Sequence, residues 1–294
     1  MVTKRVFTRW ALAVAACSVL PATVGLVGVS AAQASPERSV VYNAVLSPLP
    51  PNVPSLGFEA TSTSEFGDYV NLAGNARTLN AITVTMSDWA LHSDYPTMSS
   101  KHWKWPITVN VYSAGPVIGG LNTVGAKLAT ITENITIPWR PPASASCGTA
   151  WMASDGQCYN GIAFNAKFDM SELHVKLPDS VIIGVAYNTA DYGTAPTHAP
   201  GPYNSLNVGV PTNDPVTVGS DVSTDNVFWN TSHAGFYADG GAGGVGILRE
   251  DTNWTPNGTV ALKITTSGRE DGHHGHGDEG HGNGHGDHGR NAND

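Results

Sequence analysis

Apolar and polar residues alternate with a period of two through most of the chain, and this pattern constrains the fold more than any other feature. In the segments 81–86 and 107–112, apolar residues at every second position are separated by Thr or Asn. Successive side chains of a β-strand point to opposite faces, so the pattern predicts strands with one buried face. Similar segments occur at 128–135, 162–168, 173–177, 181–187, 206–210 and 260–265.

Clusters of Pro and Gly separate these segments, as at 48–52, 141–142 and 240–241. Each cluster ends strand pairing, because Pro removes a hydrogen-bond donor and Gly permits a positive φ. No helical period is evident in the same region. About ten short strands without helices predict an all-β fold, a single antiparallel β-sandwich of jelly-roll-like kind, over residues 35–266.

The first 34 residues have the organisation of a secretory signal peptide. The first ten residues include Lys4, Arg5 and Arg9 and no acidic residue. An apolar run follows over 11–29, and Ala32-Gln33-Ala34 provides the small residues of a cleavage site. We therefore expect a secreted, extracellular protein, released or held at the cell surface, without a transmembrane segment once residues 1–34 are removed. A membrane anchor, a lipoprotein box at Cys17 and a twin-arginine export signal are alternatives.

Charge is sparse, with 13% charged residues and a formal net charge of -9. Such a chain has no basic surface with which to neutralise phosphates, so nucleic acid is not expected as a partner. Long charged helices are excluded by the same composition. Of the three cysteines, Cys147 and Cys158 remain after signal removal, and an even pair in an exported protein predicts a disulfide. A site with two thiolate metal ligands is the alternative.

Residues 267–294 are rich in His and Gly and hold no large apolar side chain, so a disordered tail is predicted. Imidazoles separated by Gly can bind Zn, Ni or Cu, and transition-metal ions are therefore expected partners, although no cofactor is expected to be required. The alternative is a solvated tail with incidental metal affinity. The candidate metal ligands are His273, His274, His276, His281, His285 and His288.

Motifs for catalysis are mostly lacking, and no catalytic residue is predicted. The segment 241–246 matches the pattern G-x-G-x-x-G, but no helix pattern follows it, so a flexible loop is expected. The carboxylates of Glu59, Glu65 and Asp68 would serve a glycosidase only if two of them faced each other across a cleft. The segment 221–225 has spaced oxygen ligands but lacks the glycine of a calcium loop, and a turn is expected there.

Tryptophan residues are the remaining clue to a ligand, because flat rings can stack on sugars as well as fill a core. Trp89 ends an alternating segment and is expected inside. Trp103, Trp105, Trp139 and Trp151 lie near Pro-, Ser- or Gly-rich segments and are expected to be exposed. Trp103 and Trp105, in what we expect to be a long loop, are the candidate stacking residues.

Several short runs of the chain form a recognisable set. They are Val41-Tyr42-Asn43, Pro51 to Thr61, Thr63 to Asp68, Val84 to Trp89, Gly184 to Thr189 and Tyr203 to Gly209. Together these runs resemble those of a family of secreted actinobacterial proteins that has no assigned activity. The resemblance covers about 40–265 and implies a secreted or surface location and a β-rich domain. It provides no catalytic residue.

The sequence thus predicts an exported, non-enzymatic β-sandwich protein whose His-rich tail binds transition metals. The alternative is an extracellular carbohydrate-binding module or glycoside hydrolase, with cell-surface or extracellular polysaccharide as its partner. A structural or adhesive surface component is a third hypothesis, which requires self-association.

Overall fold

A computed structural model describes residues 37–200 and 205–268. These residues form fifteen strands and a few short 3-10 helices, which confirms the all-β prediction. Within them, no helix is long and apolar enough to cross a membrane. The predicted signal peptide and the six histidines of the predicted tail lie outside the described residues.

One sheet has six strands in the order β1-β15-β4-β11-β2, and β9 also pairs with β4. All pairings in it are antiparallel. β4 is the centre of this sheet because β9 lies along one side of it while β15 and β11 share the other. The strands are β1 Arg38–Asn43, β2 Ser55–Gly57, β4 Thr78–Asp88, β9 Ile162–Asp169, β11 Leu206–Gly209 and β15 Leu262–Ser267.

The other sheet has seven strands in the order β14-β13-β3-β10-β5-β6, with β12 also paired to β3. Its pairings are antiparallel as well. The strands are β3 Thr63–Asn71, β5 His102–Ala114, β6 Val124–Pro138, β10 Ser180–Ala186, β12 Ser220–Asp221, β13 Val227–Thr231 and β14 Arg249–Asp251.

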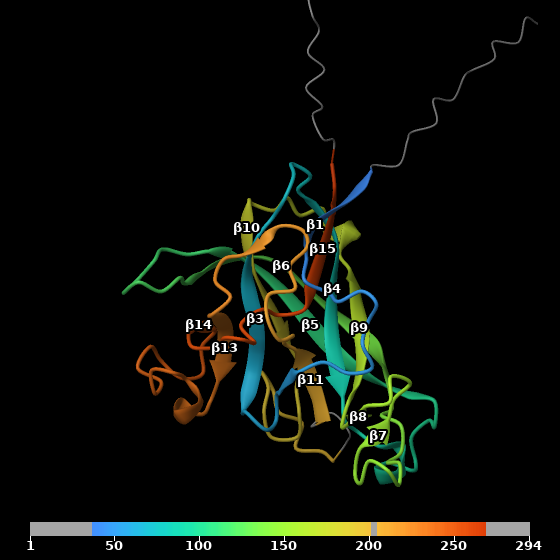
Figure 1. Ribbon diagram of the computed structural model, residues 1–294. Helices are drawn as coiled ribbons and strands as arrows, with labels where there is room; N and C mark the ends of the chain where they lie inside the picture. The colour runs from blue at the N-terminus through green and yellow to red at the C-terminus, as the bar shows by residue number, and fades with distance from the viewer. Residues whose placement is uncertain (1–36, 201–204, 269–294) are drawn as a thin grey trace, which may run out of the picture. The chain divides into compact units, whose positions relative to one another are not determined.

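The two sheets form an antiparallel sandwich, and the chain passes repeatedly from one sheet to the other, as in a jelly roll (Figure 1). Strand β9 shows the predicted period of two, because Phe164, Ala166 and Phe168 are buried while the residues between them are exposed. The apolar faces of both sheets meet in one core. Its largest fully buried side chains include Tyr42, Phe58, Phe66, Ile82, Met86, Ile107 and Phe168.

A two-stranded sheet, β7 Trp151–Met152 with β8 Cys158–Tyr159, lies outside the sandwich (Figure 1). The Cys147–Cys158 disulfide closes this segment, with a Cα–Cα distance of 5.6 Å, so the predicted pairing is confirmed. The guanidinium of Arg140 donates a hydrogen bond of 3.0 Å to the carbonyl of Thr149 and so fastens the segment to the end of β6.

Two local predictions are wrong. Residues 173–177 do not form a strand, since the 3-10 helix η2 Ser171–Leu173 occupies their start and a single bridge joins Lys176 to Thr78. The expected long loop around Trp103 and Trp105 is instead the first part of β5, which pairs with β6 from His102 onward. Two Ser and Lys101 before these tryptophans, and Pro106 after them, obscured the alternation.

Candidate functional site

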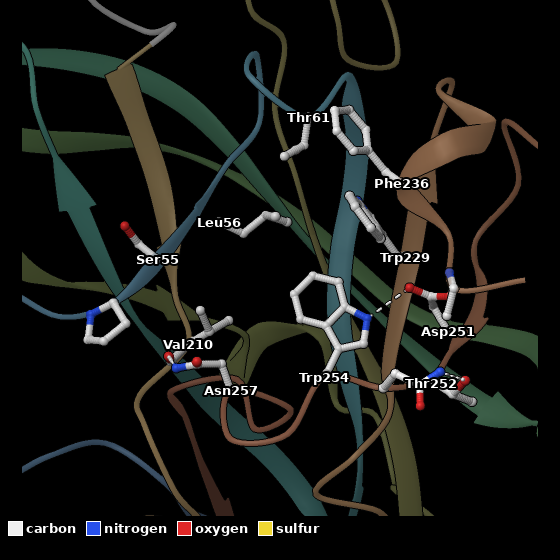
Figure 2. A pocket seen from close by; sticks show the side chains of 13 residues that line it. Ser55, Leu56, Thr61, Val210, Trp229, Phe236, Asp251, Thr252, Trp254 and Asn257 are labelled. Atoms are coloured by element: carbon white, nitrogen blue, oxygen red, sulfur yellow. Dashed lines mark hydrogen bonds between the residues drawn. The ribbon is translucent and has the colours of Figure 1, made fainter. Parts of the chain in front are cut away.

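A pocket of about 720 Å³ opens where the ends of the two sheets come together. On one side it is bounded by β2, the last strand of the first sheet, and on the other by β13 and β14 at the end of the second (Figure 2). We call it the edge pocket. It is lined by Pro54, Ser55, Leu56, Thr61, Val210, Trp229, Phe236, Ala238, Asp251, Thr252, Asn253, Trp254 and Asn257.

A turn after β14 presents Trp254, whose ring lies between Leu56 and Asp251 in Figure 2. The indole N–H donates a hydrogen bond of 2.8 Å to Asp251 Oδ2, which fixes the ring. The backbone of the turn is held by Asp225, whose carbonyl accepts from the Trp254 N–H and whose carboxylate accepts from the Thr255 N–H, both at 3.0 Å. The Trp254 ring is therefore preorganised as one wall of the pocket.

Trp229 and Phe236 form the aromatic wall beside it. The Trp229 ring lies edge-on to Trp254 with centroids 5.1 Å apart, and stacks on Phe236 with centroids 6.1 Å apart. Trp229 is buried and its N–H donates to Thr63 Oγ1 at 2.7 Å. Phe236, in the 3-10 helix η4 Ala234–Phe236, is 40% exposed and so provides the accessible part of this wall.

The long connection that carries Phe236 is held by a cluster around Tyr237. Its hydroxyl accepts from the Thr231 N–H at 3.0 Å, and the Arg249 guanidinium lies 3.7 Å from its ring centroid. Arg249 also makes two hydrogen bonds, of 2.7 and 2.8 Å, to the carboxylate of Asp239. These bonds lower the pKa of Asp239 and keep it ionised, and they fix the connection between β13 and β14.

The polar groups of the edge pocket are mainly hydroxyls and amides. Among its lining residues Asp251 has the one carboxylate, and none carries a cationic side chain. Asp251 Oδ1 accepts from the Ala238 N–H at 2.9 Å, and Oδ2 accepts from Trp254. Asn257 Nδ2 donates to the Val210 carbonyl at 2.7 Å. The pocket thus combines apolar rings with fixed neutral polar groups and a single acid.

The tryptophans proposed from the sequence do not line this pocket. Trp103 is 4% exposed and donates to Asp88 Oδ2 at 3.1 Å, and Trp139 is also buried, so the expectation of exposed rings is wrong for both. Trp105 is partly buried and donates to the Asn188 carbonyl at 2.9 Å. Trp151 is partly exposed. Trp89, expected inside, is 44% exposed, because it falls just beyond β4.

The carboxylates considered for glycosidase chemistry are not paired. Glu65 and Asp68 lie three positions apart on β3, so their side chains point to opposite faces of the sheet. Asp68 is buried against the loop before β15, where it accepts from the Val260 N–H at 3.0 Å. Glu59 lies beside Asp191, and burial together with that carboxylate raises its pKa.

Sequence reasoning missed Trp229, Phe236, Asp251 and Trp254. The available signal was the stretch 252–258, where Trp254 stands among Thr, Asn, Pro and Gly, a composition typical of an exposed turn. The predicted turn near Asp225 is present. No three His, Cys, Asp or Glu side chains within residues 37–200 and 205–268 are grouped so that they could hold a metal ion.

Fold and site together define an all-β sandwich protein with an aromatic pocket at one edge. Comparison of the chain with protein-family models, with curated proteins and with solved structures finds no match. The resemblance to secreted actinobacterial proteins therefore stays a prediction.

Proposed function

We propose that this protein is an exported, non-enzymatic module that binds a saccharide in the edge pocket. The observation that carries the proposal is the pair of preorganised aromatic walls, Trp254 on one side and Trp229 with Phe236 on the other, next to Asp251 and Asn257. Sugar rings have apolar C–H faces that pack on aromatic rings, and hydroxyls that bond to carboxylates and amides. The pocket volume also lies within the range of about 300–1,000 Å³ that is usual for small-molecule sites.

The electrostatics of the pocket favour a neutral saccharide. A uronate or a sulfated sugar would bring a negative charge next to Asp251, and no lining residue offers a cation to balance it. Like charges at close range are disfavoured most where water is excluded. Binding rather than hydrolysis is favoured, because a glycosidase of the usual kind needs two carboxylates across the sugar and the lining has one.

The test is a glycan array probed with wild-type protein and three variants. We expect binding to one class of neutral glycan, reduced at least about tenfold by Trp254→Ala and by Phe236→Ala, because each removes an aromatic face. Phe236 is the safer probe, since its side chain is already 40% exposed. Trp89→Ala removes an equally accessible ring elsewhere and is the matched control. No binding to neutral glycans, or equal losses in Trp89→Ala and Phe236→Ala, would contradict the proposal.

A second function, transition-metal binding by the C-terminal tail, is proposed from the sequence. Six of the chain's 11 histidines lie between residues 273 and 288, interleaved with Asp and Glu. We expect that removing residues 272–294 abolishes Zn or Cu binding in calorimetry and leaves the melting temperature of the sandwich unchanged. An undiminished metal stoichiometry in the shortened protein would refute the role of the tail.

A further inference from the structure

The outer face of the second sheet holds a cluster of polar side chains that the edge pocket does not use. Asn110 and Tyr112 point outward from β5, and Glu65 points outward from β3, with β10 between the two strands. Gly184 on β10 leaves the space through which the Glu65 carboxylate reaches Asn110. A Cβ atom at Gly184 would overlap Glu65 Oε1.

Three side chains converge on the hydrogen-bonded pair of the Asn110 amide and the Glu65 carboxylate. Asn110 Nδ2 donates to Glu65 Oε1 at 2.8 Å, and the Tyr112 hydroxyl donates to the same oxygen at 2.9 Å. On the other side of the amide, Asn110 Oδ1 accepts from Lys127 Nζ at 3.1 Å and from Thr130 Oγ1 at 2.8 Å. Lys127 and Thr130 both belong to β6. An amine, an amide and a carboxyl group are thus in direct contact.

This arrangement has the parts that transfer of an acyl group to an amine requires. Lys127 is a nucleophile at the amide, Thr130 donates to the oxygen on which negative charge would develop, and Glu65 touches the leaving nitrogen. We propose that Lys127 and Asn110 form an intramolecular isopeptide bond, with Glu65 as the group that moves the protons. The bond would join β5 to β6, which is the edge strand of the sheet.

The reaction balances without any further reactant. The reacting form is the one in which a proton has passed from the Lys127 ammonium to the Glu65 carboxylate. In this form Nζ attacks Asn110 Cγ, so that a bond forms between Nζ and Cγ while the bond between Cγ and Nδ2 breaks. Glu65 gives its proton to Nδ2, which leaves as ammonia, and takes up the proton that Nζ loses on becoming an amide nitrogen. Glu65 ends in its initial state, as a catalytic residue must.

The surroundings of Glu65 suit this role. Burial raises the pKa of its carboxyl group, against the opposing effect of the hydrogen bonds from Asn110 and Tyr112 and of the Lys127 charge. A protonated carboxyl is what the leaving nitrogen needs. The Lys127 amine lies 5.3 Å from the centroid of the Tyr112 ring, which restricts its position close to the amide.

Mass spectrometry of the purified protein tests the proposal. We expect an intact mass lower than that of the processed sequence by one ammonia, and no tryptic cleavage after Lys127. Because no Lys or Arg lies between residues 110 and 127, the linkage is identified in a chymotryptic digest, in which cleavage after Tyr112 leaves a branched peptide that links the two residues. Lys127→Arg should have the full mass. Cyclisation at one of the Asn-Gly pairs, 160–161, 257–258 or 283–284, would also release ammonia. That loss would persist in Lys127→Arg, and it would give no branched peptide.

A second variant separates catalysis from folding. Glu65→Gln keeps the size of the side chain and an oxygen that can accept hydrogen bonds, but it has no transferable proton. The mass loss should therefore develop about 10²-fold more slowly or not at all. The circular dichroism spectrum should stay that of the wild type. Full mass in the wild type with tryptic cleavage after Lys127 would overturn the proposal. Formation of the bond at an unchanged rate in Glu65→Gln would overturn the role of Glu65.

Discussion

At the scale of single residues, Asp251 connects the fold to the edge pocket. Its two oxygens accept from the Ala238 N–H and from the Trp254 indole, and so join the β13–β14 connection to the turn after β14. The side chain is 4% exposed, which means that water cannot replace either bond. A buried donor that loses its acceptor costs about 1–3 kcal/mol, so one carboxylate determines the geometry of both aromatic walls.

Asp251→Asn should therefore lower the free energy of unfolding by about 1–3 kcal/mol, because the new amide group turns a donor toward one of the two donors. Urea denaturation measures the change. Asp179→Asn is the control, since Asp179 pairs with Arg77 at 2.9 Å but is almost fully exposed. It should cost less than about 1 kcal/mol. Equal losses in the two variants would show that the Asp251 bonds do not hold the site.

Single residues were also where the sequence was least informative. Clusters of polar residues, Pro and Gly mark a segment as a loop, but they do not tell which of the aromatic rings beside them are buried. Trp103 was therefore expected in an exposed loop and is buried in β5, whereas Trp254, in a polar turn, forms a wall of the pocket. The sequence also did not tell which carboxylates lie close together in space. Glu65 and Asp68 are near each other in the sequence but lie on opposite faces of β3.

At the scale of elements, strands with strict alternation were predictable and others were not. The predicted segments 162–168 and 181–187 agree with the observed bounds of β9 and β10 to within one residue at each end. β3 was not expected, because it contains Glu65, Gly67 and Asp68, which are uncommon in strands. These residues are tolerated because hydrogen bonds satisfy both acids and because Gly67 permits the close approach of the Ile183 carbonyl on β10.

The segment closed by Cys147 and Cys158 should behave as a separate element. Its two short strands pair with each other and not with the sandwich. Replacing both cysteines with Ser removes the constraint on a loop with a sequence separation of 11, worth about 3 kcal/mol or less in the chain-entropy estimate. We expect faster proteolysis and amide exchange in residues 141–161, with the protection of β4 and β10 unchanged. Loss of protection in the sandwich strands would contradict this independence.

At the scale of the whole molecule, buried acids set the dependence of stability on pH. Burial raises the pKa of Asp88 to about 7 and that of Asp221 to about 6, and it raises the pKa of Asp68 well above its ordinary value. Repulsion between Asp68 and Asp221 adds to the effect on Asp68. The folded protein therefore binds these protons more tightly than the unfolded chain does.

Stability should consequently fall as the pH rises from about 4 to 7, because unfolding then releases protons that the folded state retains. Asp239 acts in the opposite direction, since its lowered pKa stabilises the fold above its ordinary pKa and loses this effect as the pH falls below it. We expect a higher melting temperature at pH 5 than at pH 8 in scanning calorimetry. A melting temperature that increases steadily from pH 5 to pH 8 would contradict the assignment.

The central claim, that the edge pocket binds a saccharide, is tested most directly by following the tryptophan indole N–H signals in a ¹H–¹⁵N NMR titration. The ligand is the neutral glycan that the array identifies. We expect a saturable shift of the Trp254 signal, and a smaller one of the Trp229 signal, while the signals of Trp89 and Trp151 stay in place. Saturable shifts confined to Trp103 and Trp105, with Trp254 unmoved, would contradict the claim.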